Sequence, residues 1–86
     1  MSEKNVIVDV RNKEQYEQGS IPGALSIPVE ELDGRLEELD KDSHVTVVCN
    51  RGGQRSQRAL ELLKEKGYQK ADILEGGMVK WKEENN

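Results

Sequence analysis

The segment Val45–Ser56, with the sequence VTVVCNRGGQRS, decides the fold. An apolar, β-branched run ends at Cys49, the only cysteine of the chain, and a glycine-containing turn follows. A helical pattern then covers residues 56–66, so a buried strand, a turn and a helix follow one another directly. Consecutive backbone N–H groups in such a turn, together with the positive end of the helix dipole, predict an anion-binding loop.

Cys49 is the candidate nucleophile of this loop. Three arginines follow Cys49 in the sequence, namely Arg51, Arg55 and Arg58. We expect their charge and the helix N-terminus to lower the pKa of the thiol and favour the thiolate. The chain has 17 acidic residues, yet none of them lies within 43–60, which indicates a local anion-attracting patch. A lone cysteine is most often a small buried hydrophobe. The glycines, the arginines and the helix start favour a functional thiol instead.

Composition limits the class of protein. The 86 residues make a single domain, 1–86, with a formal net charge of −4, which argues against nucleic acid or an anionic membrane as a partner. No apolar run approaches the ~18 residues of a membrane span, and the N-terminus lacks the apolar core of a signal peptide. One cysteine forms no internal disulfide, which is typical of a reducing compartment, so we predict a cytoplasmic protein. No Cys/His cluster indicates a metal site.

Strands alternate with helices along the chain. Strands are expected at 6–10, 25–27, 45–49 and 71–74. Helices are expected at 13–18, from Pro28 through Leu39, at 56–66, and after a turn at Gly76-Gly77. The first helix has Asn12 as its N-cap and Gln15 at the capping-box position. This alternation predicts an α/β fold with a parallel sheet of about four strands and helices on both faces. In such sheets ligands bind beyond the carboxyl ends of the strands, where Cys49 lies.

Other polar residues near the loop have structural interpretations. Asp9 and Arg11 flank the end of the first strand, and we interpret them as an ion pair or loop anchor. His44 precedes Cys49 by five residues, so an extended strand separates the two by roughly 16 Å. We therefore predict that His44 is a solvated residue at the strand start and not a partner of Cys49.

Several short motifs occur in a characteristic order. They are Val8–Arg11, Glu14 and Tyr16, Gly19–Ala24 with Ile27-Pro28, Val48-Cys49, Arg55-Ser56, Gly67-Tyr68, and Leu74–Met78 with Trp81. With these motifs the chain resembles the single-domain rhodanese family of sulfurtransferases along nearly its whole length. The resemblance implies a rhodanese-like α/β fold, Cys49 as the active-site cysteine, and no metal or organic cofactor.

The resemblance also implies a two-step reaction. The Cys49 thiolate would attack a small anionic sulfur donor such as thiosulfate, and a persulfide would form on Cys49. A thiol or a sulfur-relay protein would then accept the outer sulfur. The implied substrate-binding residues are those of the loop, namely Asn50, Arg51, Gly52, Gly53, Gln54, Arg55 and Ser56.

The loop departs from the family pattern in its length. Five residues separate Cys49 from Arg55, whereas the family usually has one fewer, so Gly52 or Gly53 looks inserted. The longer spacing is the signature of related phosphatases and arsenate reductases, which is the alternative function. Gln54 stands where such phosphatases often have a glutamate, and an amide is no general acid. A non-catalytic rhodanese-like binding module is the third possibility.

Both ends of the domain carry smaller expectations. Ser20 stands where the family more often has histidine. Family members usually begin with an additional strand and helix, whereas only five residues precede Val6 here. We therefore expect the last strand, 71–74, to be an exposed sheet edge that invites pairing with another chain. The expected state is a monomer or a weak homodimer.

Overall fold

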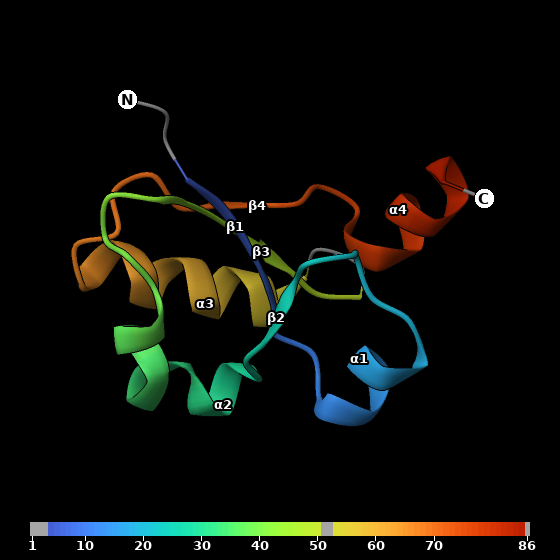
Figure 1. The fold of residues 1–86 in the computed structure, drawn as a ribbon, viewed down its shortest axis with the longest axis horizontal. Coiled ribbons are helices and arrows are strands. Elements are labelled where there is room, and N and C mark those ends of the chain that lie inside the picture. Colours follow the sequence, from blue (N-terminus) through green and yellow to red (C-terminus); the bar gives the residue numbers. More distant parts are fainter. Residues whose placement is uncertain (1–3, 51–52, 86) are drawn as a thin grey trace.

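The computed structural model describes residues 4–50 and 53–85. Its sheet has the strand order β2-β1-β3-β4, and all neighbouring strands are parallel (Figure 1). The strands are β1 (Asn5–Asp9), β2 (Leu25–Ser26), β3 (His44–Val48) and β4 (Asp72–Ile73). The predicted parallel sheet of about four strands is confirmed. The predicted strand ends shift by one residue or more.

Helices connect the strands. They are α1 (Lys13–Gln18), α2 (Val29–Leu32), the 3₁₀ helix η1 (Asp33–Glu38), α3 (Gln54–Glu65) and α4 (Gly77–Glu84). In Figure 1, α2 and α3 lie near each other, and α4 lies away from them. Helix α3 begins two residues before the predicted start, so it takes in more of the loop that follows Cys49.

Side chains of β3 show that the sheet is covered on both faces. Val47 and Val48 are consecutive and both fully buried, and consecutive strand residues point to opposite faces. Val47 belongs to the larger core cluster, with Leu63 of α3, and Val48 belongs to a second cluster, with Met78 of α4. The predicted arrangement of helices on both faces is therefore confirmed.

The predicted helix from Pro28 through Leu39 is wrong in form. The α-helical part, α2, ends at Leu32, and η1 contains a non-helical residue, Arg35, with φ −123° and ψ 16°. The Arg35 guanidinium donates to Glu38 and to the Ser26 carbonyl. These bonds, next to a glycine of low helix propensity at position 34, favour a break at Arg35 over a continuous helix.

Helix α1 begins as its sequence predicts. The Asn12 side chain accepts a hydrogen bond of 2.8 Å from the backbone N–H of Gln15, and the N–H of Gly19 closes the other end on Tyr16. The side chain of Gln15 is engaged elsewhere, with Arg55 of α3. This contact ties α1 to α3 across the sequence.

His44 is not simply solvated, which corrects the prediction. It is half-buried, and its Nε2 lies 2.7 Å from the carboxylate of Asp72 on β4, to which Thr46 also donates. His44 opens β3 and Cys49 follows the end of that strand, so the two residues lie at opposite ends, as predicted. The contact joins β3 to the edge of the sheet.

The last strand lies at a sheet edge, as predicted, but it is shorter than the predicted strand 71–74. Strand β4 lies at one edge of the sheet but spans only Asp72–Ile73. So short a strand offers few backbone groups to another chain. The weak homodimer stays a prediction.

Tyr68 anchors the loop after α3 and gives a test of packing. Its side chain is buried, and its Oη lies 2.8 Å from the carbonyl oxygen of Leu36 and 3.1 Å from that of Leu39. We expect Tyr68→Phe to lower the free energy of unfolding by about 1 kcal/mol, because two buried carbonyls lose their donor. Urea unfolding at neutral pH measures this change.

Alkaline pH should separate the wild type from the Tyr68→Phe variant further. Burial, and then the charge of Asp40, raise the pKa of Tyr68. The unfolded chain therefore ionises first, and the contribution of Tyr68 to stability is full below the ordinary pKa of about 10 and falls as pH rises beyond it. The Tyr68→Phe variant has no phenol at this position, so its free energy of unfolding should fall less at alkaline pH than that of the wild type. Equal losses in both proteins would contradict the assignment.

Candidate active site

Cys49 lies at the carboxyl end of an inner strand, directly after β3, and is 4 % exposed. Gly53 is the N-cap of α3, and its backbone N–H donates to Cys49 Sγ over 3.1 Å. The sulfur therefore lies against the first turn of a twelve-residue helix. A backbone N–H and the positive helix end both stabilise negative charge on sulfur.

The backbone on either side of Cys49 is held by α4. The N–H of Met78 donates to the Cys49 carbonyl at 2.9 Å, and the N–H of Val79 donates to the Asn50 carbonyl at 3.0 Å. A trans peptide places its C=O and the following N–H on opposite sides, so the Asn50 N–H points away from α4. Sequence reasoning assigned Gly76-Gly77 only a turn and missed this role. The double glycine before a helix start was the available signal.

Gly76 makes this arrangement possible and can be tested. It has φ +80°, and an added Cβ would lie 2.6 Å from Lys80 Cβ. We expect Gly76→Ala to lower the free energy of unfolding by about 1–2 kcal/mol and to slow reactions at Cys49, since α4 would shift against the loop. Urea unfolding and thiol alkylation rates measure both effects.

The matched control is Gly34→Ala. Gly34 lacks a positive φ, and within residues 4–50 and 53–85 no atom from elsewhere in the fold lies within 4 Å of its added Cβ. This substitution should leave stability unchanged or raise it by about 0.4–1 kcal/mol, with no effect at Cys49. Equal behaviour of the two variants would contradict the role given to Gly76.

A pocket of about 340 Å³ opens at the cysteine. The described residues that line it are Cys49, Asn50, Gly53, Gln54 and Arg55, all of them predicted site residues. Arg55 is the only charged residue among these. The described lining of the pocket therefore combines a sulfur atom, a backbone donor and the Arg55 guanidinium.

The remaining predicted site residues are not among these. Ser56 is fully buried in α3, its hydroxyl has no hydrogen-bond partner among the described residues, and it is not among the residues that line the pocket. Its contact with substrate stays a prediction. Arg51 and Gly52 lie outside the described residues.

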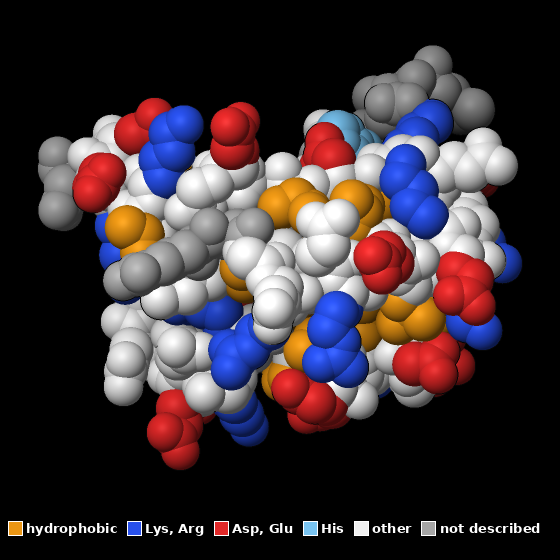
Figure 2. Space-filling view, turned by 180° about the vertical axis from the view of Figure 1, so that it is seen from behind, with side chains coloured by type: hydrophobic (Ala, Val, Ile, Leu, Met, Phe, Trp, Pro, Cys, Tyr) orange, Lys and Arg blue, Asp and Glu red, His pale blue; other side chains and the backbone are white. Residues whose placement is uncertain are grey.

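Two arginines of the acid-free segment are exposed on α3. Arg55 donates from Nη1 to Gln15 Oε1 at 3.3 Å, and Arg58 lies further along the same helix. On the face shown in Figure 2, Lys and Arg side chains are interspersed with acidic side chains. This face of the acidic protein therefore carries charges of both signs.

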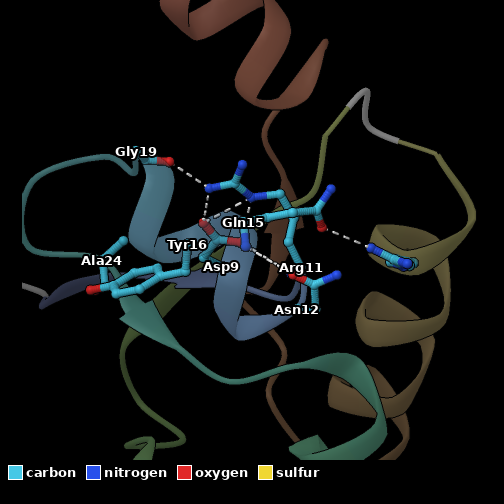
Figure 3. Close-up of polar contacts among 8 residues, drawn as sticks. Asp9, Arg11, Asn12, Gln15, Tyr16, Gly19 and Ala24 are labelled. Carbon is cyan, nitrogen blue, oxygen red and sulfur yellow. Dashed lines mark hydrogen bonds and ion pairs between the residues drawn. The ribbon is translucent and has the colours of Figure 1, made fainter.

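Asp9 and Arg11 form the structural ion pair that the sequence predicted. Both side chains are almost fully buried, and Arg11 Nη2 lies 2.7 Å from Asp9 Oδ2 (Figure 3). Asp9 accepts further bonds from the Arg11 side chain and backbone, and Arg11 Nη2 also donates to the Gly19 carbonyl at 2.8 Å. The pair joins the end of β1 to the end of α1.

Within residues 4–50 and 53–85, no group of three or more His, Cys, Asp or Glu side chains could hold a metal ion. Over the same residues, no helix is long and apolar enough to cross a membrane.

A parallel sheet flanked by helices, with a cysteine at the turn from an inner strand to a helix, defines a class of small α/β domains with a cysteine in the active-site loop. Within that class the rhodanese-like domain model matches residues 1–84, and the chain belongs to this family. The family expected from the sequence motifs is confirmed.

Several curated relatives carry names that concern sulfur. The chain is 36% identical over 80 residues to a sulfurtransferase of Allochromatium vinosum, covering 93% of this chain and 74% of the relative. It is 36% identical over 75 residues to a putative sulfur carrier protein of Bacillus subtilis, covering 87% of this chain and 40% of that longer relative. It is 44% identical over 63 residues to the thiosulfate sulfurtransferase PspE of Escherichia coli, covering 71% and 60% of the two chains.

Solved structures agree with the fold. A rhodanese-related protein from Thermoplasma volcanium is 35% identical and superposes with a TM-score of 0.83, covering 93% of this chain and 78% of the other. The parallel sheet and its flanking helices are therefore those of the family.

Proposed function

We propose that this chain is a sulfurtransferase that moves a sulfane sulfur through a persulfide on Cys49. The observation that carries the proposal is the Gly53 N–H on Cys49 Sγ, in a pocket whose described lining has Arg55 as its only charge. An anion that enters this pocket meets a cation and a nucleophile together. The names of the sulfurtransferase relatives support the same activity.

The first step forms the persulfide. The Cys49 thiolate attacks the outer sulfur of thiosulfate, the S–S bond of the donor breaks, and sulfite leaves with the electron pair. The outer sulfur then carries negative charge as the anion of the persulfide. Backbone N–H donors and the N-terminus of α3 stabilise that charge, which is the electrostatic part of covalent catalysis.

The second step returns the enzyme to its starting state. A nucleophilic acceptor (cyanide in an assay, a thiol or a sulfur-relay protein in a cell) attacks the outer sulfur, and Cys49 leaves as the thiolate. Thiosulfate as donor is supported by the name of the Escherichia coli relative, and a relay acceptor by that of the Bacillus subtilis relative. The single cysteine supports a reducing compartment such as the cytoplasm.

Thiocyanate formation tests this function. The purified chain with thiosulfate and cyanide should release thiocyanate and sulfite in equal amounts. A chain that releases no thiocyanate and gains no sulfur from thiosulfate would contradict the proposal and leave the phosphatase and binding-module interpretations.

Loop length favours a second candidate, a phosphatase or arsenate reductase. The five residues between Cys49 and Arg55 match the signature of those enzymes. Gln54 opposes it, because this residue lines the pocket with an amide that cannot protonate a leaving group.

Deletion of Gly53 separates the two candidates. It restores the shorter spacing and puts Gly52 before α3, so we expect sulfur transfer to persist or rise and any hydrolysis of an aryl phosphate to fall. Gly53→Ala keeps the length and is the control, since, apart from its neighbours in the chain, no described residue comes within 4 Å of its added Cβ. Loss of sulfur transfer in a folded deletion variant would contradict this account of the loop.

A further inference from the structure

Arg11 and Arg55 are held in opposite ways. Arg11 is buried, and its guanidinium contacts both carboxylate oxygens of Asp9, which cancels its charge. Arg55 is exposed, lines the pocket, and donates to the neutral side-chain amide of Gln15. Only the second arrangement leaves a positive charge available to a ligand.

Gln15 is presented from a helix whose position is fixed. Its backbone N–H is bonded to Asn12 Oδ1, and the next residue, Tyr16, donates from Oη to the Ala24 carbonyl at 2.6 Å. The Gln15 side chain is half-buried, and it meets Arg55 although 40 positions separate them in sequence. A guanidinium has only donors, so the amide turns its oxygen toward Arg55.

We propose that Gln15 is a positioning residue that makes the Cys49 pocket selective for anions. Its amide oxygen holds the Arg55 guanidinium at the pocket without neutralising it. A carboxylate at this position would form an ion pair with Arg55 and remove the charge that attracts the ligand. The proposal rests on the proposed function and narrows its donors to small anions, in preference to neutral sulfur compounds of similar size.

Alkylation of Cys49 by two reagents tests this selectivity without any sulfur transfer. Iodoacetate and iodoacetamide share the reacting carbon and differ in charge, and the single cysteine ensures that only this site reacts. The readout is the ratio of their second-order rate constants. The variants are Gln15→Glu and Gln15→Ala. The control is Gln18→Glu, which changes the net charge equally on an exposed residue of the same helix.

The expected result is a lower preference for iodoacetate in Gln15→Glu. The ratio should fall about three- to tenfold relative to Gln18→Glu, and the difference should shrink in 1 M salt, as screening weakens exposed charges. The ratio for Gln15→Ala should lie between those of the wild type and Gln15→Glu, because Arg55 keeps its charge but loses its hydrogen bond to the Gln15 amide. In the transfer assay, Gln15→Glu should raise KM for thiosulfate by a similar factor and change kcat little.

Equal ratios for Gln15→Glu and Gln18→Glu would overturn the inference, because charge alone would then explain both. Failure of both reagents to reach Cys49 would also overturn it, since no charge-selective entry would exist. The test of the proposed function has an outcome independent of the alkylation ratios. A chain with the expected alkylation ratios that forms no thiocyanate keeps the anion selectivity and loses the sulfurtransferase activity.

Discussion

Cys49→Ser should lower sulfur transfer from thiosulfate at least about a thousandfold, because a hydroxyl is a far weaker nucleophile than a thiolate and holds no persulfide. The pocket would keep Arg55 and the loop backbone, so binding of the anion would survive without reaction. Thiocyanate release under saturating thiosulfate and cyanide measures the loss.

A folding control is needed because Cys49 is buried in the main core cluster. Cys49→Ala avoids a buried hydroxyl and should be equally inactive, and circular dichroism should show the native helix content in both variants. Activity retained in either folded variant would place the nucleophile elsewhere and contradict the proposed function.

Asp9→Asn should destabilise the domain more than any surface substitution. It leaves the buried guanidinium of Arg11 without a counter-charge, and breaking a buried pair from one side costs about 3–5 kcal/mol. Small domains have a total stability of about 5–15 kcal/mol, so much of the folded population would be lost. Urea unfolding at pH 7 measures the loss, and Arg11→Met should give a similar one.

An exposed ion pair supplies the matched control. Arg35 forms an exposed ion pair with Glu38 and lowers the pKa of that carboxyl group. Glu38→Gln removes this ion pair, and the loss of unfolding free energy should be small because solvent screens exposed charges. The double variant Asp9→Leu with Arg11→Met removes both buried charges and should recover much of the stability. A small loss in Asp9→Asn would contradict the structural role assigned to this pair.

The two inner strands could be predicted because each is a short, mostly apolar and β-branched run that ends in polar sequence. Val45–Val48 is continuous, as expected of a strand covered on both faces, and its two core clusters follow from that pattern. The segment around Arg35 could not be predicted in the same way. Leucines at helical spacing permit both a helix and a 3₁₀ segment, and local hydrogen bonds to Glu38 and Ser26 accompany the break.

The pocket around Cys49, the proposed nucleophile, could be predicted in part from neighbours in sequence, because the strand, turn and helix around Cys49 are contiguous. The parts of the site supplied by other elements could not. Met78 and Val79 act through backbone N–H groups, which no residue type encodes. Gln15 reaches Arg55 only because the sheet order brings α1 beside the start of α3. Gln15 therefore looked like a capping residue until the fold was known.

The central claim is that Cys49 carries a sulfane sulfur, and the mass of the protein after reaction with thiosulfate tests it most directly. The intact chain should gain the mass of one sulfur atom, peptide mapping should place it on Cys49, and cyanide should remove it. The Cys49→Ser protein should gain nothing. An unchanged mass in the wild-type protein, or a sulfur that Cys49→Ser also acquires, would contradict the claim.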